Sequence, residues 1–407
     1  VGSKGESLIV SLRPVDEVVD QLLGLVEPTG KSELRTIDKA LNCCAAKDIQ
    51  SPINVPPADN SAMDGYAIAY ADANLQTSYR VSGRIPAGYV GSRLEPGTVA
   101  RIFTGAEIPV GADTVVMQEN TELSGDEVKL LSLPDQFDNV RSKGQDIQAG
   151  SLIIRKGDLL SARTLSLVAS VGVAEIEVAT PLRIAIMSTG DELVEPGNPV
   201  APGQIYNSNR YALSAMLRNM GMEVVDLGIV ADTPEATEQA LLKAASMADC
   251  ILTSGGVSVG EEDHVKAAVE KLGKLDLWKL AIKPGKPLAY GEVEGVPFFG
   301  LPGNPVSTFV TFHIVARQYL LAMQGLSDYE PFCVNGVSDF SFNGGGRREY
   351  LRVQIQNNEG QTRLSKFINQ GSGIMTSVVW ADALAMVEAG QVVKPGDRLT
   401  IYPLALC

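Results

Sequence analysis

The stretch RIAIMSTGDEL, Arg183–Leu193, indicates the fold class of the chain. An apolar run of strand length that ends in a polar, glycine-containing turn is typical of a strand buried inside a parallel sheet. Helical spacing follows around Tyr211–Met220, and EVVDLGIV, Glu223–Val230, predicts the next strand. The alternation continues with a helix at 234–247, a strand at 249–256, a helix at 263–272, a strand and turn at 298–305, and a helix through Thr311 and Leu320. This pattern predicts a central α/β three-layer domain, in which helices cover both faces of a parallel-rich sheet.

The segments outside this region have other patterns. Apolar residues at helical spacing predict a helix at Pro14–Val26, and a second helix is expected at Thr36–Ala46. From Asp48 to Gly150, short strand-like runs alternate with Gly/Pro turns, which predicts a separate β-rich domain. Helical spacing returns at Thr164–Val171. The stretch Pro331–Cys407 is short-stranded and rich in glycine, which is typical of a small β-barrel-like domain.

Composition narrows the functional classes. The chain has 407 residues and a formal net charge of -14, so its general surface disfavours nucleic acid and anionic lipid. Any anionic ligand is therefore expected in a locally basic pocket. The five cysteines form no CxxC pair, which argues against a structural zinc site and favours a reducing, cytoplasmic setting. The sequence has neither a signal-peptide pattern nor an apolar run of about 20 residues, so we expect no membrane span.

Three glycine-containing turns follow predicted strands of the α/β domain. They are STGDEL, Ser188–Leu193; TSGGVSVGEED, Thr253–Asp263; and GLPGNPVS, Gly300–Ser307. Ligands of open parallel sheets bind beyond the carboxyl ends of the strands, where these turns lie. Glycine there lets backbone N–H groups approach a phosphate. Ordinary strand–helix turns also use glycine, so the turns alone leave both interpretations open.

Acidic residues in these turns are candidates for a metal site. Asp191, Glu192, Glu261, Glu262 and Asp263 carry the hard oxygen ligands that suit Mg²⁺ bound together with substrate phosphates. Acidic residues also favour helix N-termini without any metal. We therefore select only Glu192 and Asp263 as magnesium ligands.

The segment KLAIKPGKP is unusually basic for an acidic chain. It carries Lys279, Lys283 and Lys286, and its prolines fix the shape of the loop. We interpret it as a local pocket for an oxyanion. The alternative is a solvated charged loop.

The β-rich region offers three polar candidates. Asp64 lies in PPADNSAMDGYA, Thr104 in FTGAEIP and Asp146 in RSKGQDIQAG. Each of them alone fits an ordinary turn. His264 and His313 have no metal-ligand spacing, and we assign both a structural role.

Together these motifs carry a specific resemblance. The motifs PPADNSAMDGYA, FTGAEIP, STGDEL, TSGGVSVGEED, KPGKP and GLPGNPVS occur in one order along one chain. The chain resembles, from about Pro14 onward, the molybdopterin molybdenumtransferase family of the MoeA type, which also includes the E domain of gephyrin. The resemblance implies insertion of molybdenum from molybdate into adenylated molybdopterin (molybdopterin-AMP). The reaction would include Mg²⁺-dependent cleavage of the pyrophosphate bond and release of AMP.

The resemblance also implies the assembly of the protein. It implies a homodimer whose active site lies between the α/β domain of one subunit and the Asp64-bearing β domain of the other. Molybdopterin adenylyltransferase and molybdoenzymes are expected as partners. The family's plan is an N-terminal helix packed with the α/β domain, a linking domain made of two segments, the β-rich domain, the α/β domain and a C-terminal β domain. In this order the expected limits are residues 1–27, 28–50 with 150–181, 51–149, 182–329 and 330–407.

The resemblance further implies site residues. The expected catalytic residues are Asp64, Thr104, Asp146, Glu192, Asp232, Asp263, Lys279 and Lys283. The expected substrate-binding residues are Ser188, Gly190, Asp191, Ser254, Gly255, Gly256, Ser258, Lys286, Pro302, Asn304, Pro305, Ser307, Arg347 and Ser372. Those that resemble positions proposed to hold molybdate are Lys286, Ser307, Arg347 and Ser372. Two positions depart from the family pattern, since Gln145 stands where many members have Glu and Asn207 where some have Asp.

Two alternatives stand beside this expectation. A molybdopterin adenylyltransferase shares the α/β domain, but its phosphate turn usually reads GGTG, whereas this chain reads GGVSVG at 255–260 and has the additional β-rich region. The other is a gephyrin-like scaffold without turnover. A scaffold does not need the acidic and basic site residues, which favours an enzyme. The sequence does not distinguish molybdate from tungstate.

Overall fold

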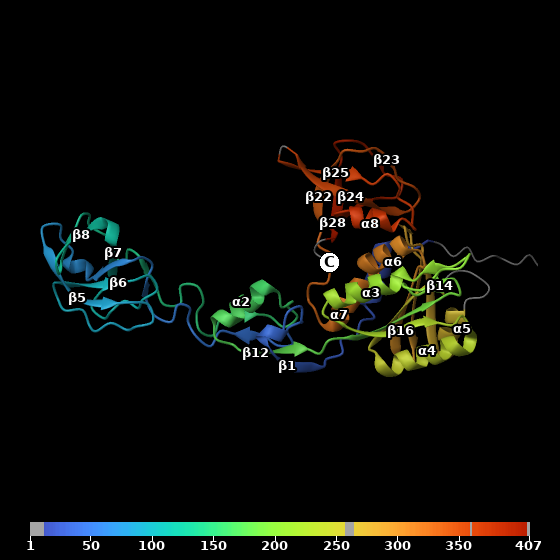
Figure 1. The fold of residues 1–407 in the computed structure, drawn as a ribbon, viewed down its shortest axis with the longest axis horizontal. Helices are drawn as coiled ribbons and strands as arrows, with labels where there is room; N and C mark the ends of the chain where they lie inside the picture. The colour runs from blue at the N-terminus through green and yellow to red at the C-terminus, as the bar shows by residue number, and fades with distance from the viewer. Residues whose placement is uncertain (1–11, 257–263, 359, 405–407) are drawn as a thin grey trace, which may run out of the picture.

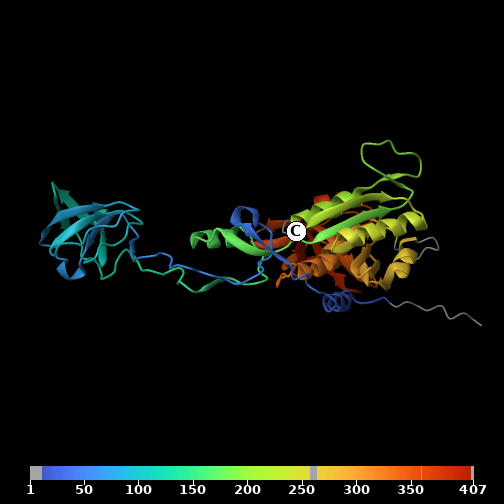
Figure 2. The ribbon, with the colours of Figure 1, turned by 90° about the horizontal axis from the view of Figure 1, so that it is seen from below.

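The computed structural model describes residues 12–256, 264–358 and 360–404. Figure 1 shows an elongated molecule with a β-rich region at one end, a small region with α2 and β12 in the middle, and the α/β region with the C-terminal strands at the other end. Figure 2 shows the same separation from a second direction, with two extended chain segments leading to the β-rich region. None of the helices in the described ranges is long and apolar enough to cross a membrane.

The α/β region is built on a six-stranded sheet with the order β16-β13-β17-β21-β20-β18. The strands are β13 (Arg183–Thr189), β16 (Glu223–Val230), β17 (Cys250–Ser254), β18 (Gly273–Lys279), β20 (Pro287–Val293) and β21 (Val296–Leu301). Strands β16, β13, β17 and β21 run parallel, as their apolar runs predicted. The β20–β21 hairpin and β18 add an antiparallel edge that the sequence pattern did not predict.

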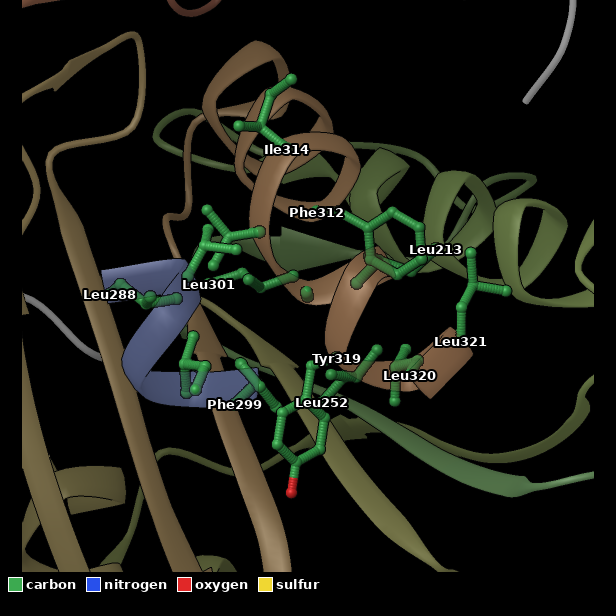
Figure 3. Close-up of a cluster of buried hydrophobic side chains, with 14 of the residues drawn as sticks. Leu213, Leu252, Leu288, Phe299, Leu301, Phe312, Ile314, Tyr319, Leu320 and Leu321 are labelled. Atoms are coloured by element: carbon green, nitrogen blue, oxygen red, sulfur yellow. The ribbon is translucent and has the colours of Figure 1, made fainter. Parts of the chain in front are cut away.

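Helices cover both faces of this sheet. One face carries α4 (Pro234–Met247) and α5 (His264–Leu272), and the other carries α1 (Val15–Leu23), α3 (Ser208–Asn219), α6 (Pro305–Thr311), the π-helix η4 (Phe312–Ala316) and α7 (Arg317–Gln324). Figure 3 shows Leu213, Phe312 and Tyr319 from the second helix layer gathered with Leu252 and Phe299 from the strands. The predicted three-layer α/β domain is confirmed.

The side chains of β13 explain why there are two cores. Ile184 and Ile186 belong to the cluster beneath α1, α3, α6 and α7, whereas Ala185 and Met187 belong to the cluster beneath α4 and α5. Successive side chains of a strand point to opposite faces, so a continuous apolar run supplies both layers. The strand ends at Thr189, and the polar turn that follows it lies at the edge of the sheet.

The C-terminal region is a small closed barrel. Its strands are β22 (Val334–Ser338), β24 (Arg348–Asn358), β25 (Gln361–Lys366), β26 (Ala383–Val387) and β28 (Arg398–Pro403), with α8 (Met375–Trp380) between β25 and β26. The barrel closes because β24 pairs with both β25 and β26. The short strand β19 (Ile282–Lys283) of the KPGKP loop joins β24 in parallel, which connects the α/β region to the barrel. The predicted β-barrel-like region is confirmed.

The β-rich region is one sheet with the order β7-β4-β6-β5-β9-β8. Its strands are β4 (Gly65–Ile68), β5 (Ser78–Ile85), β6 (Thr98–Ile102), β7 (Thr114–Met117), β8 (Thr121–Ser124) and β9 (Glu127–Leu130). Two separate clusters of buried apolar side chains, one around Tyr79 and one around Ala100, fill the region. Its core is therefore independent of the α/β core.

The middle region is small and partly helical. It contains β1 (Ser32–Thr36) paired with β12 (Glu175–Ala179), β2 (Ile49–Gln50) paired with β11 (Leu152–Ile154), and α2 (Ala162–Ser170). The remaining short pairs of the molecule are β3 (Asn60–Ser61) with β10 (Val140–Arg141), β14 (Leu193–Val194) with β15 (Ile205–Tyr206), and β23 (Phe342–Asn343) with β27 (Val392–Val393).

The helix predicted at Thr36–Ala46 is wrong. A single 3₁₀ turn, Ile37–Lys39, is followed by extended chain in which Cys44 bridges to Leu159 and Ala45 to Val178. Ala40, Cys43 and Ala45 are buried in the core of the middle region, so tertiary pairing overrides the local helical pattern.

The exact limits of the domains stay a prediction.

Candidate active site

A deep cleft lies at the carboxyl ends of β13, β17 and β21. Its volume is about 990 Å³, and its walls come from the turns after these strands, the KPGKP loop, Arg347 and the loop 370–373 of the C-terminal region. The sequence-predicted residues that line it are Glu192, Ser254, Gly255, Gly256, Lys283, Lys286, Pro302, Asn304, Pro305, Ser307, Arg347 and Ser372. The structure thus brings together residues that are far apart in the chain, at the place where parallel sheets bind ligands.

The cleft is basic although the chain is acidic. Lys283, Lys286 and Arg347 line it, and Glu192 is the one acidic side chain among its described lining residues. The ammonium of Lys283 lies 3.0 Å from Oε2 of Glu349, whose side chain is almost fully buried. Such a cluster of cations attracts anions to the cleft against the field of the whole molecule.

Lys283 and Arg347 are held by their surroundings. The Glu349 carboxylate also accepts a hydrogen bond from the N–H of Gly345 at 3.0 Å, so it has two donors. Nη1 of Arg347 donates to the carbonyl oxygen of Ile282 at 2.9 Å. Both cations are therefore tied to the junction of β19 and β24. This arrangement limits their freedom before any ligand binds.

The KPGKP loop has a backbone that only glycine adopts readily. Gly285 has φ of +112°, and a Cβ at this position would lie 2.3 Å from Oγ1 of Thr311 on α6. The N–H of Leu280 donates to the carbonyl oxygen of Lys286 at 2.7 Å and closes the loop. The backbone of the loop is thus a packed structural element, while the side chains of Lys283 and Lys286 remain exposed.

The turn after β17 approaches the turn after β13 closely. Gly255 and Gly256 have positive φ values of +90° and +65°, and a Cβ on Gly256 would lie 2.7 Å from Oγ1 of Thr189. Ser188 lies below the cleft, where its hydroxyl is 3.3 Å from Oδ1 of Asn207 and 3.4 Å from the hydroxyl of Ser254. Ser188 therefore supports the floor instead of lining the cleft.

The STGDEL turn presents one carboxylate to the cleft. A Cβ on Gly190 would lie 2.4 Å from Oε2 of Glu192, so the absence of a side chain at Gly190 makes room for this carboxylate. Gly190 and Asp191 do not line the cleft themselves. Ser258 and Asp263 lie outside the described residues. Among the described residues, no three metal-ligating side chains come together.

Asp64 and Thr104 form a second polar group, on the β-rich region. Both the N–H and the hydroxyl of Thr104 donate to Oδ1 of Asp64, each at 2.8 Å. These two hydrogen bonds hold the pKa of the Asp64 carboxyl below its ordinary value, and Arg101 adds a smaller effect in the same direction. Asp64 is thus kept ionised. In this chain the β-rich region lies at the opposite end of the molecule from the cleft (Figure 1).

Three further predicted residues do not line the cleft. Asp146 is exposed in the β-rich region, Asp232 lies in the turn between β16 and α4, and Lys279 ends β18. The carbonyl oxygen of Lys279 accepts a hydrogen bond from the N–H of Arg13 at 2.8 Å, so its backbone anchors the N-terminal segment.

Other lining residues were not predicted from the sequence. They include Thr189, Tyr206, Asn207, Asn209 and Gln370. Asn209 donates from Nδ2 to the carbonyl oxygen of Gly303 at 2.8 Å, which ties α3 to the turn after β21. Asn207 was noticed only as a departure from the family pattern, and its position as the N-cap of α3 was the available signal.

Arg352 is a further residue that the sequence did not reveal. Its side chain is almost fully buried, and burial lowers the pKa of its guanidinium to about 10. It donates to the hydroxyl of Ser377 at 3.1 Å and to the carbonyl oxygens of Tyr350 and Gly371 at 3.0 and 3.3 Å. Gly371 belongs to the cleft loop 370–373, so Arg352 fixes this loop from behind.

Together the fold and the cleft define a class of protein. It is a multidomain α/β protein with a basic cleft at the carboxyl edge of its sheet, and a C-terminal barrel completes the wall of this cleft. Three family models match successive parts of the chain: the MoeA N-terminal region (domain I and II) at residues 13–172, a probable molybdopterin binding domain at 185–322, and the MoeA C-terminal region (domain IV) at 338–404.

Individual proteins agree with the family models. A molybdopterin molybdenumtransferase from Haemophilus influenzae is 38% identical, over 96% of this chain and 98% of its own length. One from Nostoc is 35% identical, over 97% of this chain and 94% of its own length. A crystal structure of a molybdopterin biosynthesis MoeA protein from Pyrococcus horikoshii OT3 is similar with a TM-score of 0.83 at 26% identity, and covers 97% of this chain and 100% of that one. The chain therefore belongs to the molybdopterin molybdenumtransferase (MoeA) family, an enzyme family of molybdenum cofactor biosynthesis, which confirms the resemblance found in the sequence.

Proposed function

We propose that the protein inserts molybdenum from molybdate into adenylated molybdopterin, cleaving the pyrophosphate bond and releasing AMP. The observation that carries this proposal is the basic cleft, where Lys283, Lys286 and Arg347 meet at the carboxyl edge of the sheet. Both substrates are anions, so a positive cleft in a chain of formal net charge -14 matches their chemistry. Membership in the molybdopterin molybdenumtransferase family supports this reaction.

Molybdate is proposed to bind among Lys286, Ser307, Arg347 and Ser372, which all line the cleft. A tetrahedral dianion needs several donors, and a guanidinium, an ammonium and two hydroxyls supply them. The N–H of Val306 donates to the carbonyl oxygen of Ser372 at 3.0 Å, so the barrel loop and the start of α6 stay in contact. We propose that tungstate, which has the same shape and charge, binds at the same place.

Mg²⁺ fits the cleft as a proposed cofactor. A magnesium ion usually takes one or two carboxylates together with substrate phosphates, and Glu192 places one carboxylate on the wall above Gly190. Bound there, the ion would neutralise charge on the pyrophosphate during cleavage. Lys283 faces the same cleft and adds positive charge for the pyrophosphate oxygens. Asp263 stays proposed as the other magnesium ligand, and lies outside the described residues.

The protein is proposed to act as a homodimer with shared active sites. Asp64 and Thr104 lie on the β-rich region, far from the cleft of their own chain (Figure 2). If Asp64 orients water or metal at the pyrophosphate, a second copy has to supply it. We further propose a cytoplasmic setting, an adenylyltransferase as the source of the adenylated pterin, and apo-molybdoenzymes as acceptors of the product.

The first test is turnover. The purified protein is incubated with molybdopterin-AMP, Mg²⁺ and molybdate, and AMP release and molybdenum on the pterin are followed. Molybdate-dependent release of AMP supports the transferase. A folded dimer that binds molybdopterin without releasing AMP contradicts it and supports a gephyrin-like scaffold.

The shared site is tested by mixing two inactive variants, Asp64→Ala and Glu192→Ala. In a mixed dimer one site receives an intact Asp64 from one chain and an intact Glu192 from the other. Random exchange of equal amounts should restore about a quarter of wild-type turnover, because half the dimers are mixed and each has one intact site. Mixtures that stay inactive after subunit exchange contradict the shared site.

A further inference from the structure

A pair of arginines lies beside Asp64 on the β-rich sheet and has no assigned role. Arg84 on β5 and Arg101 on β6 are direct partners in the parallel register of these two strands. Both guanidiniums contact the ring of Phe103, with their central carbons 4.6 and 4.7 Å from the ring centroid. Phe103 immediately precedes Thr104, so the two cations are next to the Asp64–Thr104 hydrogen bonds.

The pairing depends on an irregularity in the sheet. Val81 pairs with Val99, but the register shifts before Gly83, which pairs with Ala100. Without this bulge Arg101 would face Gly83 instead of Arg84. The hydroxyl of Ser82 donates to the carbonyl oxygen of Val99 at 3.2 Å and accepts a hydrogen bond from Thr98, which stabilises the bulge. Bulges that re-aim a side chain are frequent beside functional sites.

The pair carries positive charge that the protein does not neutralise by contact. Like charges directly opposite each other destabilise a sheet. Across the described ranges of this acidic chain, neither Arg84 nor Arg101 forms an ion pair with a carboxylate. Arg101 donates only to neutral oxygens, those of Gly65 at 3.1 Å and of the Gln118 side chain at 2.6 Å. Two adjacent guanidiniums that contact no carboxylate directly are well suited to a phosphate, which they can bind with several parallel hydrogen bonds.

We propose that Arg84 and Arg101 form a phosphate-binding site of the β-rich region, which holds the nucleotide phosphate of the adenylated substrate beside Asp64. The inference rests on the proposed function for the identity of the substrate. The two arginines neutralise the phosphate that would otherwise be repelled by the ionised Asp64. The site therefore adds to the affinity for the adenylated substrate, whereas the affinity for molybdate depends on the basic cleft alone.

The test uses the full-length protein and compares Arg84→Gln, Arg84→Lys and the double variant Arg84→Gln/Arg101→Gln with wild type. Arg80→Gln is the matched control, because Arg80 lies on the same strand and is paired with Glu95. We expect Arg84→Gln to raise the KM for molybdopterin-AMP on the order of tenfold, with the KM for molybdate unchanged. The lysine variant should recover part of this loss, and Arg80→Gln should behave as wild type.

Thermal unfolding and the KM for molybdate distinguish phosphate binding by Arg84 and Arg101 from a purely structural role of these residues. A rise in both KM values, an equal effect of Arg80→Gln, or a wild-type KM for molybdopterin-AMP in the double variant would overturn the proposal. A rise in the molybdate KM alone would mean that the pair binds molybdate, and would overturn it as well.

The site is also tested without turnover. Calorimetric binding of AMP and of inorganic pyrophosphate is measured for wild type, Arg84→Gln and Arg80→Gln. Weaker binding of AMP or pyrophosphate by Arg84→Gln alone supports the site even if the wild type releases no AMP, an outcome that would contradict only the proposed function. Equal binding of both probes by all three proteins overturns the site.

Discussion

Gly285→Ala tests whether the packing of the KPGKP loop determines the geometry of the cleft. At φ of +112° a residue with a side chain is strained by about 1–3 kcal/mol. The new Cβ would lie 2.3 Å from Oγ1 of Thr311, which is fully buried and cannot move into solvent. Overpacking of this kind costs about 1–3 kcal/mol more, so we expect a total loss of about 2–6 kcal/mol in the free energy of unfolding.

The same change is expected to reduce turnover by more than it reduces the folded fraction. Lys283 and Lys286 flank Gly285 and both face the cleft. A displacement of about 1 Å in a positioning group lowers activity by about a hundredfold. Urea unfolding gives the stability, and AMP release under conditions where the variant is fully folded gives the activity.

Thr311→Ala provides the control for this prediction. The hydroxyl of Thr311 is buried without a hydrogen-bond partner among the described residues, so its removal alone should cost no more than about 1 kcal/mol. In the double variant the steric part of the loss disappears and the backbone strain remains, which predicts a coupling of about 1 kcal/mol or more. A Gly285→Ala protein with wild-type stability and turnover, or strictly additive losses in the double variant, would refute the reasoning.

Other residues give shorter tests. Glu349→Gln leaves Lys283 without its anionic partner, and we expect a loss of about 1–2 kcal/mol in urea unfolding together with a higher KM for molybdopterin-AMP, since Lys283 is proposed to face the pyrophosphate; unchanged values of both would show that the ion pair contributes to neither stability nor binding. Asp64→Asn keeps an oxygen for Thr104, so the fold should persist while AMP release falls by about 10²–10⁴-fold; a wild-type rate would remove Asp64 from the mechanism. Burial lowers the pKa of His313 to about 4, whereas the unfolded chain binds this proton near its ordinary pKa of about 6.5. The free energy of unfolding should therefore fall as the pH falls from about 6.5 towards about 4, by about 2 kcal/mol at pH 5. His313→Phe should lose this dependence when unfolding curves recorded at pH 5 and above about pH 6.5 are compared.

The sequence predicted the parts of the site that come from local chemistry. Lys283 and Lys286 were predicted because prolines and a glycine surround them, and Glu192 because it follows a glycine turn at a strand end. In each case the residues that support the prediction lie within a few positions of the predicted residue in the sequence. The helix expected at Thr36–Ala46 failed because long-range pairing of Cys44 and Ala45 decides the local structure there.

The parts that could not be predicted depend on distant segments meeting. Gln370 and Asn209 are ordinary polar residues in the sequence, and they line the cleft only because α8 of the C-terminal region packs against α6, which in turn packs against α3. The buried position of Arg352 follows from the closure of β24 onto both β25 and β26, which no local pattern specifies. Periodicity likewise did not separate the antiparallel β20–β21 hairpin from the parallel strands, because both are apolar runs of similar length.

Strand β24 contacts two walls of the cleft, the lysine wall formed by the KPGKP loop and the serine loop 370–373. Near its start, Glu349 holds Lys283 of the KPGKP loop, and three residues later Arg352 holds the loop 370–373 through Gly371. The α/β region supplies the glycine turns and the barrel supplies Arg347 and Ser372, so neither region contains a complete site. Because β19 pairs with β24, the lysine wall and the serine loop are both attached to the same strand of the barrel. The cleft is therefore formed by the two regions together, and its shape depends on strand β24.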